Sequence, residues 1–131
     1  MIAFDTNFLV RLAVVDDAAQ VEIVQRLVAE NSVFISNTVL LETEWVLRSR
    51  YKETPGDIHA FFSAVSASAQ TSFENAQAIA QALDWYELGA DFADALHLAA
   101  CGTTVMHTFD QNFCSMARKA GITPQVRIWQ V

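Results

Sequence analysis

Short apolar runs that can form strands alternate along this chain with segments of helical periodicity. The candidate strands lie at residues 1–4, 33–35, 71–73, 103–109 and 126–129. Between them, apolar residues return every three or four positions, as they do on one face of a helix. This alternation predicts an α/β domain in which a central, mainly parallel sheet is flanked by helices and connected by right-handed crossovers.

The helical segments have ends that the sequence marks with polar caps, a proline and a glycine. We expect Asn37 or Thr38 to cap the third helix, Thr54-Pro55 to start the fourth, and Gly89 to break the chain before Asp91. The third and fourth helices together resemble an inserted helical hairpin. The expected helices cover residues 8–13, 21–28, 38–51, 54–65, 74–88, 91–101 and a short stretch around 116–117.

Length and composition predict one domain over residues 1–131. Of the 131 residues, 53% are apolar, which is enough for one substantial core. No apolar run is long enough for a membrane span, and Asp5 interrupts the amino-terminal run before it could act as a signal. Cys101 and Cys114 are expected to be free thiols. We therefore expect a cytoplasmic protein that does not associate with membranes.

The formal charge of −7 argues against binding of nucleic acid by broad electrostatic attraction. The formal charge does not argue against a site where several carboxylates gather around a divalent cation, because the bound ion reverses the local electric field that a phosphate meets.

Several acids follow the predicted strands. Asp5 and Asp110 stand at or just past strand ends, and Glu42 lies early in the helix after the strand at 33–35. Asp94 lies in the first turn of the helix that Asp91 opens. In parallel sheets, ligands bind beyond the carboxyl ends of the strands, so these acids are expected to meet at one edge.

Each of these acids also has a purely structural interpretation. Asp5, Asp91 and Asp110 are good helix N-caps, and Asp94 is a favourable first-turn carboxylate. Glu42 could be an ordinary exposed helix residue. For each of these acids, the structural and the functional interpretation both remain open.

Two glutamates compete for the functional position on the third helix. Glu44 has Arg48 four residues later, which indicates an ordinary surface ion pair. Glu42 is followed three and four residues later by Trp45 and Val46, which would place it on an apolar face where it needs a partner. We therefore favour Glu42 over Glu44.

Clustered carboxylates repel one another and raise each other's pKa values unless a cation neutralises them. A hard, oxygen-preferring ion such as Mg²⁺ suits such a cluster, and the site could then activate water and stabilise charge on a phosphate. Phosphodiester hydrolysis is the reaction class that these residues favour.

Other sites have weaker support. Asp94, His97 and Cys101 share a helix face, but a core histidine and a buried thiol are favoured over zinc. No glycine-rich phosphate loop of the Rossmann or P-loop type is present. Four aromatic residues that could stack on bases are expected to pack in the core instead; these are Phe61, Phe62, Trp85 and Tyr86.

Four segments resemble successive motifs of PIN-domain ribonucleases, and most closely those of the VapC toxins of prokaryotic toxin-antitoxin pairs. They occur in the family's order and cover nearly the whole chain. The segments are Ile2-Ala3-Phe4-Asp5-Thr6-Asn7, Leu41-Glu42-Thr43-Glu44-Trp45-Val46-Leu47-Arg48, Asp91-Phe92-Ala93-Asp94-Ala95-Leu96 and Thr108-Phe109-Asp110.

The resemblance implies a PIN-like fold and an endoribonuclease that depends on Mg²⁺ or Mn²⁺. Carried over by position, Asp5, Glu42, Asp94 and Asp110 form the catalytic, metal-binding site. Thr6 is a supporting hydroxyl and Asp91 a less certain participant. Where the family often has a further acid, this chain has Asn112. The implied partners are an RNA substrate, with tRNA as one candidate, a small antitoxin protein and a second copy of the chain in a homodimer.

Two other functions are alternatives to the nuclease. A catalytically inactive PIN-like module for protein interaction or RNA binding is the main alternative, although all four acids are intact. A phosphoacceptor receiver domain would need paired acids after its first strand, where this chain has Asp5-Thr6-Asn7. The candidate phosphate contacts are Arg11, Arg48, Arg50, Lys52, Arg118 and Lys119, although a solvated surface residue is the default interpretation of each.

Overall fold

The computed structural model describes residues 1–131 and confirms the alternation of strands and helices. The residues group into two compact units, Met1–Ala76 and Gln77–Val131. All strand pairs are parallel, as predicted, but the strands form one sheet in each unit, a three-stranded sheet in the first and a two-stranded sheet in the second. None of the helices has the length and apolar character that crossing a membrane requires.

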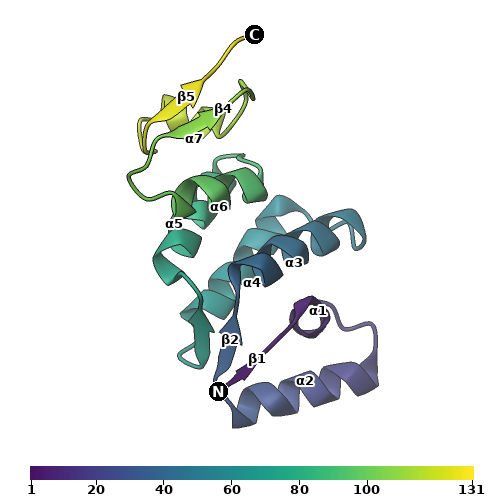
Figure 1. The fold of residues 1–131 in the computed structure, drawn as a ribbon. Coiled ribbons are helices and arrows are strands. Elements are labelled where there is room, and N and C mark those ends of the chain that lie inside the picture. Colours follow the sequence, from purple (N-terminus) through teal and green to yellow (C-terminus); the bar gives the residue numbers. More distant parts are fainter. The chain divides into compact units, whose positions relative to one another are not determined.

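The sheet of the first unit has the order β1-β2-β3 (Figure 1). Its strands are β1 (Ile2–Ala3), β2 (Val33–Ile35) and β3 (Thr71–Phe73), close to their predicted positions. Ile2 lies opposite Val33, and Val33 lies opposite Thr71. Because the strands are parallel, the residues that follow them reach the same edge of this sheet.

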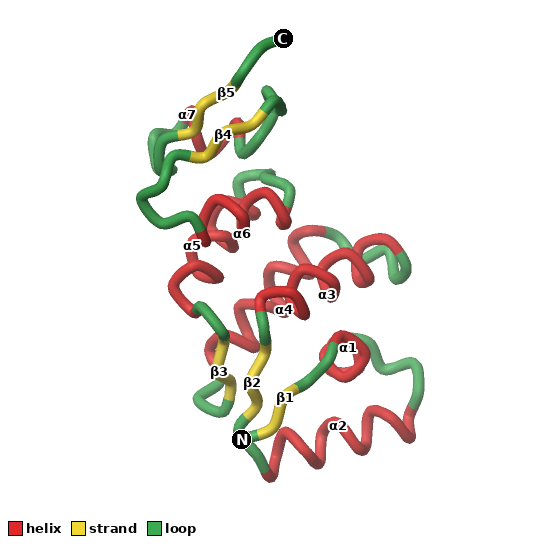
Figure 2. Tube along the Cα trace, viewed as in Figure 1, coloured by secondary structure: helices red, strands yellow, loops and turns green.

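Four helices accompany this sheet (Figure 2). Helix α1 contacts α2 and α3, α3 contacts α4, and α4 contacts β3. The close contact of α3 with α4 agrees with the predicted helical hairpin. The bounds are α1 Thr6–Ala13, α2 Ala18–Glu30, α3 Asn37–Ser49 and α4 Pro55–Ala67.

All four helices begin with a side-chain cap. Asp5, Asp17, Ser36 and Thr54 each accept a hydrogen bond from the backbone amide three residues later. The expectation that Asn37 or Thr38 caps α3 was wrong. Because β2 ends at Ile35, the next residue is still extended and its hydroxyl faces the amide of the residue three positions on.

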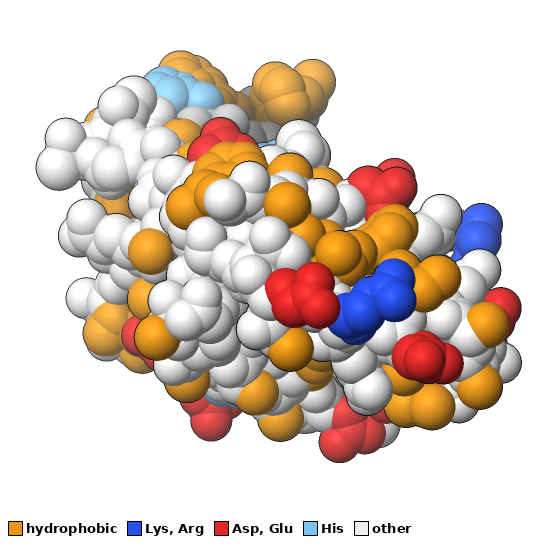
Figure 3. All heavy atoms as spheres, turned by 90° about the horizontal axis from the view of Figure 1, so that it is seen from below, with side chains coloured by type: hydrophobic (Ala, Val, Ile, Leu, Met, Phe, Trp, Pro, Cys, Tyr) orange, Lys and Arg blue, Asp and Glu red, His pale blue; other side chains and the backbone are white.

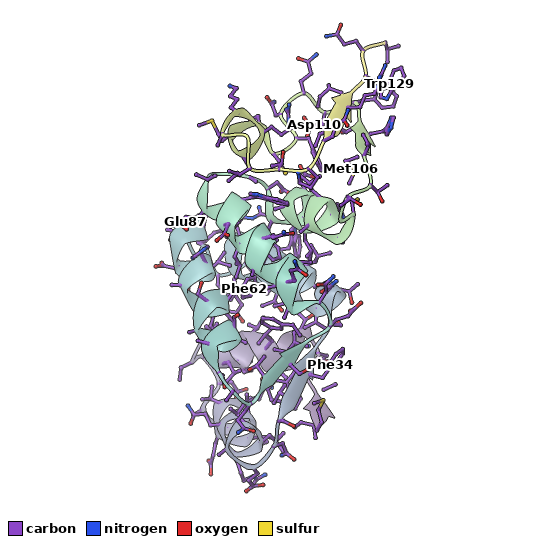
Figure 4. All side chains as sticks on the ribbon, turned by 90° about the vertical axis from the view of Figure 1, so that its left-hand side faces the viewer. Phe34, Phe62, Glu87, Met106, Asp110 and Trp129 are labelled. Atoms are coloured by element: carbon purple, nitrogen blue, oxygen red, sulfur yellow. The ribbon has the colours of Figure 1, made fainter.

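The core of the first unit combines the sheet with the inner faces of the helices. Its fully buried large side chains include Leu9 from α1, Ile35 from β2, Leu47 from α3 and Phe62 from α4. Figure 4 labels Phe62 among the packed side chains.

The second unit begins at the start of α5 (Ala76–Glu87) and contains a two-stranded parallel sheet. Met106 lies opposite Val126 in that sheet. Gly89 has a φ of 97°, a conformation that L-residues rarely adopt, and it separates α5 from α6 as predicted. The remaining elements are α6 Phe92–Ala100, β4 Met106–Thr108, α7 Ser115–Lys119 and β5 Val126–Ile128.

Aromatic side chains form much of the core of the second unit. Trp85 and Tyr86 are buried, and Tyr86 meets Phe92 edge to face with ring centroids 5.3 Å apart. Together with the buried Phe62 and half-buried Phe61 of the first unit, they confirm that these aromatic residues mainly pack rather than stack on a ligand.

Candidate functional site

Two of the four predicted acids lie beside one hollow in the first unit. Asp5 and Glu42 both line it, together with four residues that immediately follow β1 or begin α3. The hollow is open to solvent and has a volume of about 270 Å³; the other lining residues are Thr6, Asn7, Thr38 and Val39. The carboxyl edge of the sheet therefore brings Asp5 and Glu42 to one hollow, as their positions after the predicted strands indicated.

Asp5 is held by the start of α1. Its Oδ1 accepts a hydrogen bond at 3.1 Å from the backbone amide of Phe8, while the carboxylate remains exposed. One oxygen is thus fixed by the helix cap, and the group can still accept further ligands because a carboxylate has several acceptor sites. The structural and functional interpretations of Asp5 are compatible. Thr6, the expected supporting hydroxyl, is buried beside it.

The burial expected for the two α3 glutamates was reversed. Glu44 is only 4% exposed, and Arg48 donates to its carboxylate at 2.9 and 3.4 Å. Glu42 is exposed, and Trp45, which was expected to lie on an apolar face, is 51% exposed. The buried face of α3 is instead set by Leu40, Thr43, Glu44 and Leu47. Glu42 remains the better candidate because it lines the hollow with a carboxylate free to bind a ligand.

The other two predicted acids lie in the second unit. Asp91 caps α6, and its Oδ1 accepts a hydrogen bond at 3.0 Å from the amide of Asp94. The pKa of Asp94 is raised, chiefly because partial burial disfavours the charged form and further because of the negative charges of Asp91 and Asp110. The opposing influence of His97 is smaller. Asp91, Asp94 and Asp110 therefore concentrate negative charge in one region of this unit.

Asp110 lies in the loop between β4 and α7 (Figure 4). Its amide donates to the hydroxyl of Thr108 at 3.0 Å, and its Oδ1 accepts from the amide of Asn112 at 2.8 Å. The alternative interpretation of Asp110 as a helix N-cap does not hold, because α7 starts five residues later and Cys114 occupies its N-cap position. The carboxylate instead closes a tight turn and remains exposed.

Each unit thus contributes two of the four acids. In neither unit do three or more His, Cys, Asp or Glu residues form an arrangement that could hold a metal ion. The alternative zinc set of Asp94, His97 and Cys101 is not assembled either. His97 is exposed rather than in the core, because its position on α6 faces away from the buried Leu96 and Leu98. Both cysteines are free, as expected.

The donor chemistry in each unit, taken by itself, fits a hard divalent cation. The available groups are carboxylates, with hydroxyls and an amide beside them, and none of the predicted acids is paired with a lysine or arginine. Partial burial is the main cause of the raised pKa of Asp94, and the negative charges of Asp91 and Asp110 add to it. Mg²⁺ and Mn²⁺ prefer oxygen ligands and would neutralise those charges.

Glu74 is an acid that the sequence analysis did not single out. It follows β3 at the edge where Asp5 follows β1, so the strand-end rule could have found it. Its Oε1 accepts a hydrogen bond at 3.0 Å from the backbone amide of Asn37. Glu74 therefore caps the start of α3 and helps to position the helix that carries Glu42.

Most of the cations proposed as phosphate contacts have partners within the protein. Arg11 bonds to Asp16, Gln20 and Tyr51. Arg48 pairs with Glu44, Lys52 donates to the carbonyl of Ser49, and Arg118 donates to two loop carbonyls. On the face drawn in Figure 3, the cationic side chains lie among acidic ones and form no continuous positive surface. This distribution agrees with the argument against broad electrostatic binding.

The sequence matches the family model described as "PIN domain" over residues 2–119. The match spans most of the chain, and the protein therefore belongs to the PIN domain family. The family resemblance drawn from the four motifs is confirmed.

A solved structure of the VapC20 toxin of Mycobacterium tuberculosis, described as a sarcin-ricin loop cleaving toxin, is 28% identical to this chain. The comparison covers 97% of this chain and 99% of the toxin, with a TM-score of 0.45. Comparison with curated proteins gives no match.

Proposed function

We propose that this protein is an endoribonuclease that hydrolyses RNA phosphodiester bonds with Mg²⁺ or Mn²⁺, and that Asp5, Glu42, Asp94 and Asp110 together hold the metal. Membership of the PIN domain family and the motif resemblance to VapC toxins support the reaction class. The observation that carries the proposal furthest is that Asp5 and Glu42, from two separate segments of the chain, line one hollow that is open to solvent.

The proposed roles follow from how each acid is held. Asp5 and Asp110 each have one carboxylate oxygen fixed by a backbone amide, so their remaining acceptor sites are oriented for a ligand. Glu42 reaches the hollow from α3. A bound divalent ion supplies a Lewis acid that stabilises charge on the phosphate and lowers the pKa of water. The carboxylates orient this chemistry and form no covalent intermediate.

RNA must approach a protein of charge −7 without a broad cationic surface. Arg50 and Lys119 are exposed and are the two candidate phosphate contacts for which no internal hydrogen bond or ion pair is seen. With so few free cations, local phosphate contacts together with the metal would supply most of the attraction. The RNA would then be recognised through a limited number of contacts, which favours structured RNA over an arbitrary single strand.

The test is incubation of the purified protein with total RNA and Mg²⁺, followed by mapping of the cut ends, with EDTA as the control. Asp94→Asn should abolish cleavage. Asp84→Asn is the matched variant, because it removes the same charge from the exposed surface of α5. Cleavage in EDTA, or equal loss in both variants, would contradict the proposal. Retained RNA binding without any cleavage would favour the inactive PIN-like module instead.

We further propose that the nuclease is the toxin of a toxin-antitoxin pair and acts as a homodimer in the cytoplasm. An antitoxin arginine or lysine could pair with the acids, displace the metal and prevent phosphate entry. Phe62 is completely buried and is not available to a partner. Trp45 remains exposed and is available to a partner.

A second hollow could bind an apolar side chain of such a partner. It has a volume of about 180 Å³, lies between α1 and α2, and adjoins the acidic hollow because Asn7 lines both. Its walls are Phe8, Ile23 and Val24, with Arg11 and Gln20 at its polar part. One apolar side chain of a partner helix could occupy it while a neighbouring cation reaches Asp5.

Expression of the chain alone and together with the product of a small neighbouring reading frame tests this role. We expect growth arrest and RNA cleavage from the chain alone, and suppression of both in a stable complex. A chain that is harmless alone, forms no complex and cleaves RNA undiminished beside that product would exclude the toxin role but not the nuclease. Light scattering on the purified chain tests the homodimer separately.

A further inference from the structure

Arg118 was a candidate phosphate contact, but its guanidinium is already occupied. It lies in the last turn of α7 and is half-buried. Its Nε donates to the carbonyl of Phe113 at 2.7 Å, and its Nη2 donates to the carbonyl of Gln111 at 2.8 Å. One planar guanidinium therefore binds two carbonyls of the loop that follows Asp110.

The bond to Gln111 reaches the carboxylate of Asp110 through a single peptide group. The carbonyl of Gln111 and the amide of Asn112 belong to the same peptide bond. The carbonyl accepts from Arg118, and the amide donates to Oδ1 of Asp110 at 2.8 Å. Because the peptide group is planar, fixing the direction of its carbonyl also fixes the direction of its N–H.

Two backbone hydrogen bonds also hold this loop: the amide of Phe113 donates to the carbonyl of Asp110 and the amide of Ser115 donates to the carbonyl of Asn112, both at 3.1 Å. Neither involves the peptide group between Gln111 and Asn112. Asp110, Gln111 and Asn112 are all exposed, so burial does not fix them. The buried anchors begin only at Phe113 and Cys114. Arg118 therefore bridges the buried end of the loop and the exposed peptide that orients Asp110.

We propose that Arg118 is a positioning residue for Asp110 and not a phosphate contact. The expected effect of Arg118 on RNA cleavage rests on the proposed nuclease function, whereas its expected effect on the conformation of the loop does not. Arg118 sets the orientation of the carboxylate through the peptide between Gln111 and Asn112. A lysine keeps the charge but has no planar fork that reaches both carbonyls.

The variants are Arg118→Lys and Arg118→Ala, and Lys119→Ala is the matched control for the exchange measurement alone. Lys119 is the exposed neighbour on the same helix and takes no part in these bonds. The first measurement is amide exchange by NMR. We expect the Asn112 amide to exchange faster in both Arg118 variants and at the unchanged rate in Lys119→Ala. Unchanged exchange in Arg118→Lys and Arg118→Ala would overturn the proposal whether or not the protein cleaves RNA.

The second measurement is RNA cleavage at several salt concentrations. Substitution of groups that orient metal ligands typically costs about 10- to 100-fold in activity. We expect such a loss in kcat for Arg118→Lys, at unchanged KM, unchanged salt dependence and unchanged thermal unfolding midpoint. A phosphate contact would behave differently, because lysine would restore activity and alanine would raise KM and weaken the salt dependence. That second pattern would overturn the proposal while leaving the nuclease function intact.

Discussion

Asp91 accepts a hydrogen bond at 3.0 Å from the backbone amide of Asp94, three residues along the chain, and so joins two acids at the start of α6. The bond stabilises the helix, yet it also keeps a second carboxylate near Asp94, whose pKa is raised. One local feature thus favours the fold and at the same time concentrates the negative charge that a cation would relieve.

The cap and the charge can be separated by substitution. Asp91→Ala should lower the free energy of unfolding by about 1 kcal/mol, the usual cost of losing an N-cap. Asp91→Asn should keep most of the stability, because the amide oxygen of asparagine can still accept the bond from Asp94. Urea unfolding of both variants in EDTA measures this difference. Equal destabilisation by the two substitutions would show that the cap is not the stabilising feature.

The raised pKa of Asp94 predicts how stability depends on pH in metal-free protein. The native state holds this proton more tightly than the unfolded chain, so stability is lost as pH rises from the ordinary value of 3.8 through the raised pKa, and it stays lost above it. Asp94→Asn cannot ionise and should be more stable than the unchanged protein at pH 7 in EDTA. The difference in stability between Asp94→Asn and the unchanged protein should become smaller as the pH approaches 4.

Thermal unfolding between pH 4 and pH 7 measures the effect of Asp94→Asn. Asp84→Asn is again the matched control and should show no such trend. A stability difference for Asp94→Asn that is the same at every pH would mean that ionisation of Asp94 is not its cause.

Metal binding should require the acids proposed as ligands. We expect Asp5→Asn and Asp94→Asn to weaken Mn²⁺ binding in calorimetry, because each removes a negative carboxylate from the proposed ligand set. Asp84→Asn should bind Mn²⁺ like the unchanged protein. If Asp5→Asn and Asp94→Asn also bind Mn²⁺ equally well, the proposed metal site is wrong.

Substitution of Glu42 should affect RNA cleavage, whereas substitution of Glu44 should affect stability. Glu42→Gln should abolish RNA cleavage with little change in stability, because Glu42 is exposed beside the hollow. Glu44→Gln should lower stability and leave cleavage measurable, because Glu44 is buried and bonded to Arg48. Measurements of unfolding and of RNA cleavage on Glu42→Gln and Glu44→Gln in parallel compare the two glutamates. The reverse result would make Glu44 the functional acid.

Neither thiol should take part in the reaction. Burial raises the pKa of Cys114 to about 11, with the charge of Asp94 adding to the effect, so this thiol stays protonated at neutral pH. A thiol reagent should therefore modify the half-buried Cys101 first, as peptide mass mapping would show. Cys101→Ala should retain cleavage. Loss of cleavage in a folded Cys101→Ala protein would contradict the proposed metal-dependent mechanism.

Local sequence patterns determined the order of the elements and most of their ends. The strand at 33–35 and the strand at 71–73 occur where the apolar runs predicted them, and Thr54-Pro55 and Gly89 mark helix boundaries as expected. Caps, prolines and glycines act through residues only a few positions away, so the sequence carries their effect directly. The motifs were equally sufficient to identify the PIN domain family.

Tertiary packing decided which side of each element is buried. Along α3, the sequence offered Glu42 beside Trp45 and Val46 as an apolar face, whereas packing against α1 and α4 buries Glu44 and leaves Trp45 exposed. Likewise, the charge of Arg118 suggested a phosphate contact, and only the path of the loop after Asp110 brings two carbonyls within reach of its guanidinium. Such roles depend on which groups surround a side chain, and local periodicity does not contain that information.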